Sequence, residues 1–95
     1  MSDSKAAIVT GASRGIGFAV AEALARAGYN LAICGTREET VNAAAEKLSA
    51  HGVEVLPRVV NVADGEAVQA FVQEVAKHFG RLDLLVNNAG ITRDG

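Results

Sequence analysis

The chain has 95 residues, of which 49% are hydrophobic and 21% are charged, a composition typical of one small globular domain. Its formal net charge is −2 and its acidic and basic residues are interspersed, so it lacks the basic stripe expected of a protein that binds nucleic acid or an anionic membrane. We expect no secretory signal and no membrane span, and the single cysteine allows no internal disulfide, which together predict a cytoplasmic protein.

Four short apolar runs are the expected strands. They lie at 6–9, 30–34, 53–60 and 82–86. The third run contains Pro57, whose nitrogen cannot donate a ladder hydrogen bond, so we expect this strand at an edge of the sheet.

Three segments between these runs have apolar residues at helical spacing. The first carries Ile16, Ala19, Val20, Ala23, Leu24 and Ala27 and ends near Gly28. In the second, Thr36 and Glu39 have the spacing of a capping box, and the expected apolar face is Val41, Ala44, Ala45 and Leu48, before Gly52. The third is expected to begin after an Asp64 N-cap, to end at Gly80, and to bury Val68, Phe71, Val72, Val75, Ala76 and Phe79.

This alternation of strands and helices predicts an α/β fold. Consecutive right-handed strand–helix–strand units require a parallel sheet with helices on its faces. The order 3-2-1-4 places the strand with Pro57 at an edge and the first strand beside the switch point where ligands bind. We therefore expect a Rossmann-type three-layer fold, forming part of a doubly wound sheet.

The turn Thr10-Gly11-Ala12-Ser13-Arg14-Gly15-Ile16-Gly17 joins the first strand to the first helix. Its glycines allow positive φ angles, close approach of a ligand and tight packing of helix against strand. The unpaired N–H groups and the positive dipole end of the helix then favour a phosphate. A glycine-rich loop without a ligand is the alternative if the motif is taken alone.

The end of the second strand bears on the choice of cofactor. In a dinucleotide-binding fold a carboxylate there accepts hydrogen bonds from the adenosine ribose and repels a 2′-phosphate. Here the sequence is Cys34-Gly35-Thr36-Arg37, without a carboxylate, and Arg14 and Arg37 offer two guanidinium groups, which favours NADP over NAD. A solvated arginine is the alternative for either one. After the third strand, Asn61 and Val62 could supply an amide and an apolar wall for adenine, although Asn61 could equally be a turn residue.

The glycine turn and the run Asn87-Asn88-Ala89-Gly90 together resemble the paired signatures of the short-chain dehydrogenase/reductase family, and the similarity covers the whole chain. The continuation Ile91-Thr92-Arg93-Asp94 most resembles beta-ketoacyl-acyl carrier protein reductases, which use NADPH to reduce a ketone in fatty-acid elongation. The resemblance implies cofactor-binding roles for Gly11, Ser13, Arg14, Gly15, Ile16 and Gly17 at the phosphates, Thr36 and Arg37 at the adenosine end, Asn61 and Val62 at the adenine, and Asn88, Ala89 and Gly90 beside the nicotinamide.

No catalytic residue is expected within these 95 residues, because the family's Ser and Tyr-x-x-x-Lys lie in a longer chain. Tyr29 has no lysine at that spacing, and Ser13 has no neighbouring base. A metal site formed by His51, His78 and Cys34 is not expected.

We interpret residues 1–95 as the NADP-binding half of a Rossmann-type domain in an NADPH-dependent oxidoreductase. An acyl substrate would be bound only by a longer parent chain, and the bare edge of the fourth strand predicts a homo-oligomer. Two alternatives are a nucleotide-binding regulatory or scaffold module that naturally ends near residue 95, and an interaction protein that keeps the fold only as structure.

Overall fold

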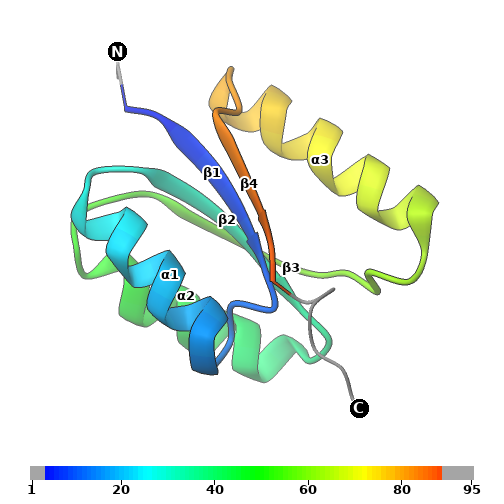
Figure 1. The fold of residues 1–95 in the computed structure, drawn as a ribbon, viewed down its shortest axis with the longest axis horizontal. Helices are drawn as coiled ribbons and strands as arrows, with labels where there is room; N and C mark the ends of the chain where they lie inside the picture. The colour runs from blue at the N-terminus through cyan, green and yellow to red at the C-terminus, as the bar shows by residue number, and fades with distance from the viewer. Residues whose placement is uncertain (1–3, 89–95) are drawn as a thin grey trace.

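The computed structural model describes residues 4–88. Its elements are β1 (Ala6–Thr10), α1 (Gly15–Arg26), β2 (Asn30–Gly35), α2 (Glu38–Ser49), β3 (Val55–Val59), α3 (Gly65–Phe79) and β4 (Leu84–Asn87). The strands form one parallel sheet in the order β3-β2-β1-β4 (Figure 1), which confirms the predicted order and the edge position of the strand with Pro57. The fold is therefore of the Rossmann type.

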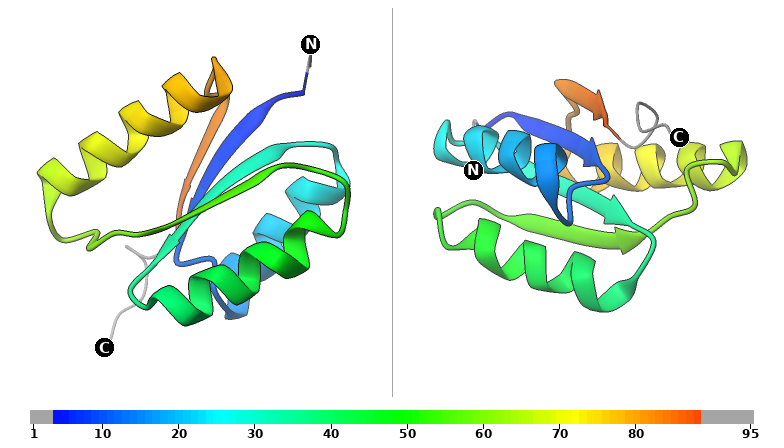
Figure 2. Two further views of the ribbon diagram at one scale, coloured as in Figure 1. Left: turned by 180° about the vertical axis from the view of Figure 1, so that it is seen from behind. Right: turned by 60° about the horizontal axis from the view of Figure 1, so that its bottom comes forward.

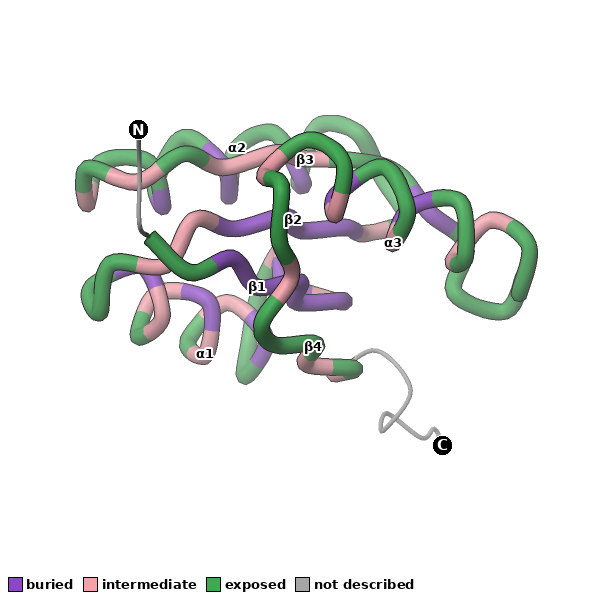
Figure 3. Tube along the Cα trace, turned by 90° about the horizontal axis from the view of Figure 1, so that it is seen from above, coloured by how far each residue is buried: buried purple, intermediate pink, exposed green. Residues whose placement is uncertain are grey.

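The sheet is the middle of three layers. Helices α1 and α2 cover one face, and α3 covers the other (Figure 2). All five residues of β1 are buried, as expected for a central parallel strand covered on both faces, and Figure 3 shows this burial continuing into β2. Within residues 4–88, no helix combines the length and the apolarity that crossing a membrane requires.

Helix α1 does not bury the apolar stripe that its sequence indicated. Its buried residues are Gly17, Ala21 and Ala25, whereas Ile16 is 72% exposed. The helix is apolar on more than one side, so its periodicity could not select the buried one. The line of Gly and Ala residues faces the sheet because small side chains allow close contact between helix and strands.

The predictions for the other two helices are mostly confirmed. Helix α2 buries the predicted face, but the predicted capping box is wrong, because the N-cap is Arg37 and no side chain caps it. The hydroxyl of Thr40 donates to the carbonyl of Arg37 instead. Helix α3 begins as predicted, with Asp64 Oδ1 accepting from the N–H groups of Glu66 and Ala67 at 3.1 and 3.2 Å, and Gly80 ends it with a φ of 77°.

Asp83 ties the start of β4 to the start of β1. Its N–H donates to the carbonyl of Ala6, and its Oδ2 accepts from the N–H of Ala6, both at 2.9 Å. The Arg81 guanidinium, 2.8 Å away, and the Ala6 N–H lower the pKa of the Asp83 carboxyl to about 2. These bonds help to set the register of β4 and hence the position of the residues at its far end.

Candidate functional site

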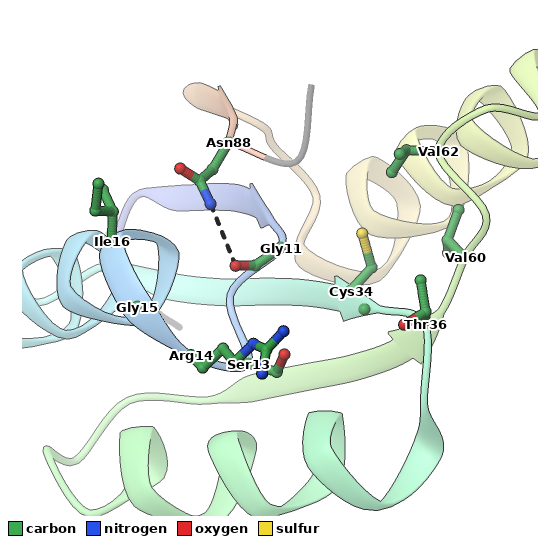
Figure 4. Close-up of a pocket in the computed structure, with 11 residues that line it drawn as sticks. Gly11, Ser13, Arg14, Gly15, Ile16, Cys34, Thr36, Val60, Val62 and Asn88 are labelled. Carbon is green, nitrogen blue, oxygen red and sulfur yellow. Dashed lines mark hydrogen bonds between the residues drawn. The ribbon is translucent and has the colours of Figure 1, made fainter. Parts of the chain in front are cut away.

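A cavity of about 590 Å³ opens at the carboxyl ends of the strands (Figure 4). It is lined by Gly11, Ser13, Arg14, Gly15, Ile16, Cys34, Gly35, Thr36, Val60, Val62 and Asn88. These residues follow or end all four strands. The topology thus gathers four distant segments at the switch point, where open α/β sheets bind ligands.

The turn between β1 and α1 requires glycine for two different reasons. Gly11 and Gly15 have φ angles of 63° and 65°, in the left-handed region that disfavours other residues. Gly17 is required by close packing, because a Cβ there would lie 2.1 Å from the carbonyl oxygen of Gly11 and 2.7 Å from Nδ2 of Asn88. The first two glycines shape the loop, and the third lets α1 pack beneath it.

The amino end of α1 is directed at this cavity. The amide of Phe18 donates to the carbonyl of Arg14 at 3.4 Å and is the first donor of the helical hydrogen-bond ladder, so the amides of Gly15, Ile16 and Gly17, which precede it, have no acceptor within the helix. Within the described turn that opens α1, no acidic side chain is present and the N-cap residue makes no side-chain capping bond. Unpaired donors and the positive end of the helix dipole therefore favour an anion here.

Backbone hydrogen bonds hold the glycine turn against the end of β2. The carbonyl of Cys34 accepts from the N–H groups of Gly11 and Ala12 at 3.0 and 3.4 Å. The thiol of Cys34 is buried, and burial raises its pKa, so it remains protonated at neutral pH. We assign it a packing role in the cavity wall.

The end of β4 closes the opposite side of the cavity. Nδ2 of Asn88 donates to the carbonyl of Gly11 at 3.3 Å (Figure 4), and Oγ1 of Thr10 donates to Oδ1 of Asn87 at 3.1 Å. Two segments separated by 77 positions in the sequence are thereby fastened together. The contacts link the glycine turn to the asparagine pair that the sequence singled out.

The structure brings most of the described predicted site residues to the cavity. Those that line it are Gly11, Ser13, Arg14, Gly15, Ile16, Thr36, Val62 and Asn88. Gly17 lies buried beneath the turn, and Ala89 and Gly90 fall outside the described residues.

Arg37 and Asn61 do not line the cavity. The Arg37 side chain is 71% exposed, and its guanidinium lies 3.6 Å from the carboxylate of Glu39. Oδ1 of Asn61 accepts from the N–H of Ala63 at 3.0 Å, the turn role left open by the sequence.

Sequence reasoning did not name Cys34, Gly35 and Val60 as site residues, although all three line the cavity. Each lies within two positions of a predicted site residue, Thr36 or Asn61, and the ends of neighbouring parallel strands meet at one edge of the sheet. Including the last residue of each predicted strand finds Cys34 and Val60, and Gly35 directly follows the second predicted strand.

The two histidines lie away from the cavity. Nε2 of His51 is 3.4 Å from the carboxylate of Glu22, and Nε2 of His78 is 2.6 Å from that of Glu54. Within the described part of the chain, no group of three His, Cys, Asp or Glu side chains could hold a metal ion.

The family model described as short chain dehydrogenase matches residues 5–95. The chain belongs to this family. Its curated relatives include the 3-oxoacyl-[acyl-carrier-protein] reductase FabG of Staphylococcus aureus strain Mu50, which is 50% identical over 96 residues. That match covers 99% of this chain but 39% of the relative, so the chain spans well under half of the relative's length.

Two solved structures that are similar to this chain contain different nicotinamide dinucleotides. The L-sorbose reductase of Gluconobacter frateurii, complexed with NADPH and L-sorbose, is 40% identical with a TM-score of 0.88, and the match covers 97% of this chain and 35% of that one. A short-chain dehydrogenase/reductase of Burkholderia phymatum in complex with NAD is 35% identical with a TM-score of 0.82, covering 87% and 30%. Membership of the family alone therefore does not choose between the two cofactors.

Proposed function

We propose that residues 1–95 form the NADP-binding half of a Rossmann-type domain in an NADPH-dependent oxidoreductase. The observation that carries the proposal is the amino end of α1, whose unpaired amides open behind a glycine turn onto a cavity built from four strand ends. The pyrophosphate of a dinucleotide matches this donor set in charge and in position.

The remaining parts of the cofactor have partners of suitable chemistry. The turn that contains Gly11, Ser13 and Gly15 would hold the phosphates, and Thr36 would contact the adenosine end, since all four residues line the cavity. Apolar side chains of Val60 and Val62 provide walls for the flat adenine ring. Asn88, with Ala89 and Gly90, binds on the nicotinamide side, and Gly17 acts by supporting the turn.

Arg14 supports NADP as the preferred cofactor. It lines the cavity, and none of the described residues that line the cavity carries a carboxylate. Arg37 can join it, because its ion pair with Glu39 is exposed on both sides and such pairs contribute only about 0.2–1 kcal/mol. Two guanidinium groups then neutralise a 2′-phosphate that an acidic site would repel.

The named relatives indicate the reaction. The relative named above is a 3-oxoacyl-[acyl-carrier-protein] reductase, and we propose the same class of reaction, reduction of a ketone by NADPH, for a protein that contains these residues. Within residues 1–95 we expect binding without turnover, because none of the described residues, 4–88, is placed to donate a proton to the developing alkoxide. We also propose a cytoplasmic location and a homo-oligomer.

Calorimetry with NADPH and NADH tests the cofactor assignment. If charged hydrogen bonds to the 2′-phosphate contribute roughly 1.5–3 kcal/mol, NADPH should bind about ten- to a hundredfold more tightly. Arg14→Ala should remove much of that preference and leave NADH binding nearly unchanged. Arg26→Ala is the matched control, because Arg26 lies at the far end of the same helix and pairs with Glu22. Equal affinities in the wild-type chain would refute the preference for NADP, and no binding of either nucleotide would refute the function.

A further inference from the structure

Val41 occupies the space next to the last residue of β2. A Cβ built on Gly35 would lie 2.6 Å from Cγ2 of Val41, whereas real Cβ contacts essentially never fall below 3.0 Å. The nearest atom of Ser13 would lie at an ordinary 3.6 Å. Among the described neighbours, Val41 is thus the one that leaves no room for a side chain at this position.

The conformation of Gly35 does not itself require glycine. The φ angle of Gly35 does not lie in the positive range, and Gly35 belongs to β2, which pairs with β3. A Gly→Ala change at such a position ordinarily stabilises a protein by about 0.4–1 kcal/mol through the unfolded state. The restriction at position 35 is therefore steric.

Val41 has little freedom to make room. It is buried between α2 and the sheet, with 1% of its surface exposed. A β-branched side chain in a helix is also held almost entirely in one χ1 rotamer. Its Cγ2 methyl consequently remains in the space that a side chain at position 35 would need.

Position 35 bears on the choice of cofactor because it lies at the carboxyl end of β2. Gly35 ends the second strand and lines the cavity, at the point where dinucleotide-binding folds place a carboxylate on the adenosine ribose. A carboxylate there accepts hydrogen bonds from the ribose of NAD and repels the 2′-phosphate of NADP.

We propose that Val41 determines cofactor selectivity from outside the cavity, by reserving position 35 for glycine and thereby excluding the carboxylate that would favour NAD. Val41 touches no cofactor and acts through residue 35, and the proposal rests on the proposed function of dinucleotide binding.

The steric part is tested without any ligand. The wild-type chain, Gly35→Ala, Val41→Ala and the double variant are compared by urea denaturation. We expect Gly35→Ala to lower the denaturation midpoint in the presence of Val41, and to leave it unchanged or raise it once Val41 is Ala. A Gly35→Ala chain as stable as the wild type would overturn the proposal.

The selectivity part is tested with the acid itself. We expect Gly35→Asp/Val41→Ala to lower the NADPH preference, measured as the ratio of NADH to NADPH dissociation constants, by roughly tenfold or more. Val41→Ala alone should leave the ratio unchanged. The matched control is Gly35→Asp/Val75→Ala, which removes the same two methyl groups from a buried valine of α3 on the opposite face and should not produce the gain in NADH binding.

The outcomes separate this inference from the proposed function. If Gly35→Asp alone, or with Val75→Ala, shifts selectivity as far as the double variant with Val41→Ala, the role of Val41 is wrong while dinucleotide binding is retained. If the wild-type chain binds neither nucleotide, both proposals are overturned.

Discussion

Replacing Gly17 by alanine should destabilise the chain, although alanine is the better helix former. The added Cβ would lie 2.1 Å from the carbonyl oxygen of Gly11, which belongs to the backbone of the glycine turn. To reach an acceptable separation, the turn and the helix would have to part by about 1 Å, a displacement typical of an overpacked core. The same Cβ would lie 2.7 Å from Nδ2 of Asn88, which donates to that carbonyl.

The Gly17→Ala substitution has one favourable and two unfavourable contributions to the free energy of unfolding. Alanine in a helix gains about 0.8–1 kcal/mol over glycine. Overpacking costs roughly 1–3 kcal/mol, and loss of the hydrogen bond from Asn88 to Gly11 costs a further 0.5–1.5 kcal/mol or so. The net destabilisation is then about 0.5–3.7 kcal/mol. Each kcal/mol lowers the melting temperature of a domain of this size by about 4–8 °C.

Thermal denaturation followed by circular dichroism measures this effect, with Gly65→Ala as the matched control. Gly65 begins α3, its φ is not in the left-handed region, and nothing lies within 4 Å of an added Cβ, so that variant should be neutral or slightly stabilised. Gly17→Ala should also weaken NADPH binding because it displaces the phosphate turn. A Gly17→Ala chain that melts at or above the wild-type temperature would refute the steric argument.

Three further measurements test other parts of the structure. Because the pKa of Asp83 is lowered from 3.8 to about 2, its charge stabilises the fold above pH 3.8, and that contribution is lost as the pH falls from 3.8 toward 2. Asp83→Asn should therefore be less stable than the wild type at pH 7, and the difference in unfolding free energy should shrink toward pH 2. A difference that is independent of pH would contradict this assignment. Asp64→Ala removes the side-chain cap of α3 and should lower the free energy of unfolding, measured by urea denaturation, by about 0.5–2 kcal/mol. An unchanged denaturation midpoint would show that the cap contributes nothing. The outer edge of β4 is unpaired in the described sheet and Leu85 is 51% exposed, so sedimentation should show self-association that Leu85→Lys reduces, and a monomer whose β4 amides resist exchange would refute the prediction.

The sequence by itself determined the order of the elements and the topology of the sheet. Pro57 cannot donate to a neighbouring strand, which identified an edge, and the crossover rule then left few arrangements. Two local signals were equally informative, since the Asp64 cap and the glycine turn are where the sequence placed them, whereas the capping-box spacing of Thr36 and Glu39 did not form a cap.

Only the tertiary structure decided which side of α1 is buried and which candidate residues reach the cavity. Periodicity could not choose between Ile16 and Gly17 as the inward residue, because the choice depends on how closely the helix approaches the sheet. Arg37 was selected for its charge alone, but its guanidinium pairs with Glu39 outside the cavity. The tight contact between Gly35 and Val41 joins two elements whose separation is set by packing of the whole core, so no local sequence pattern could report it.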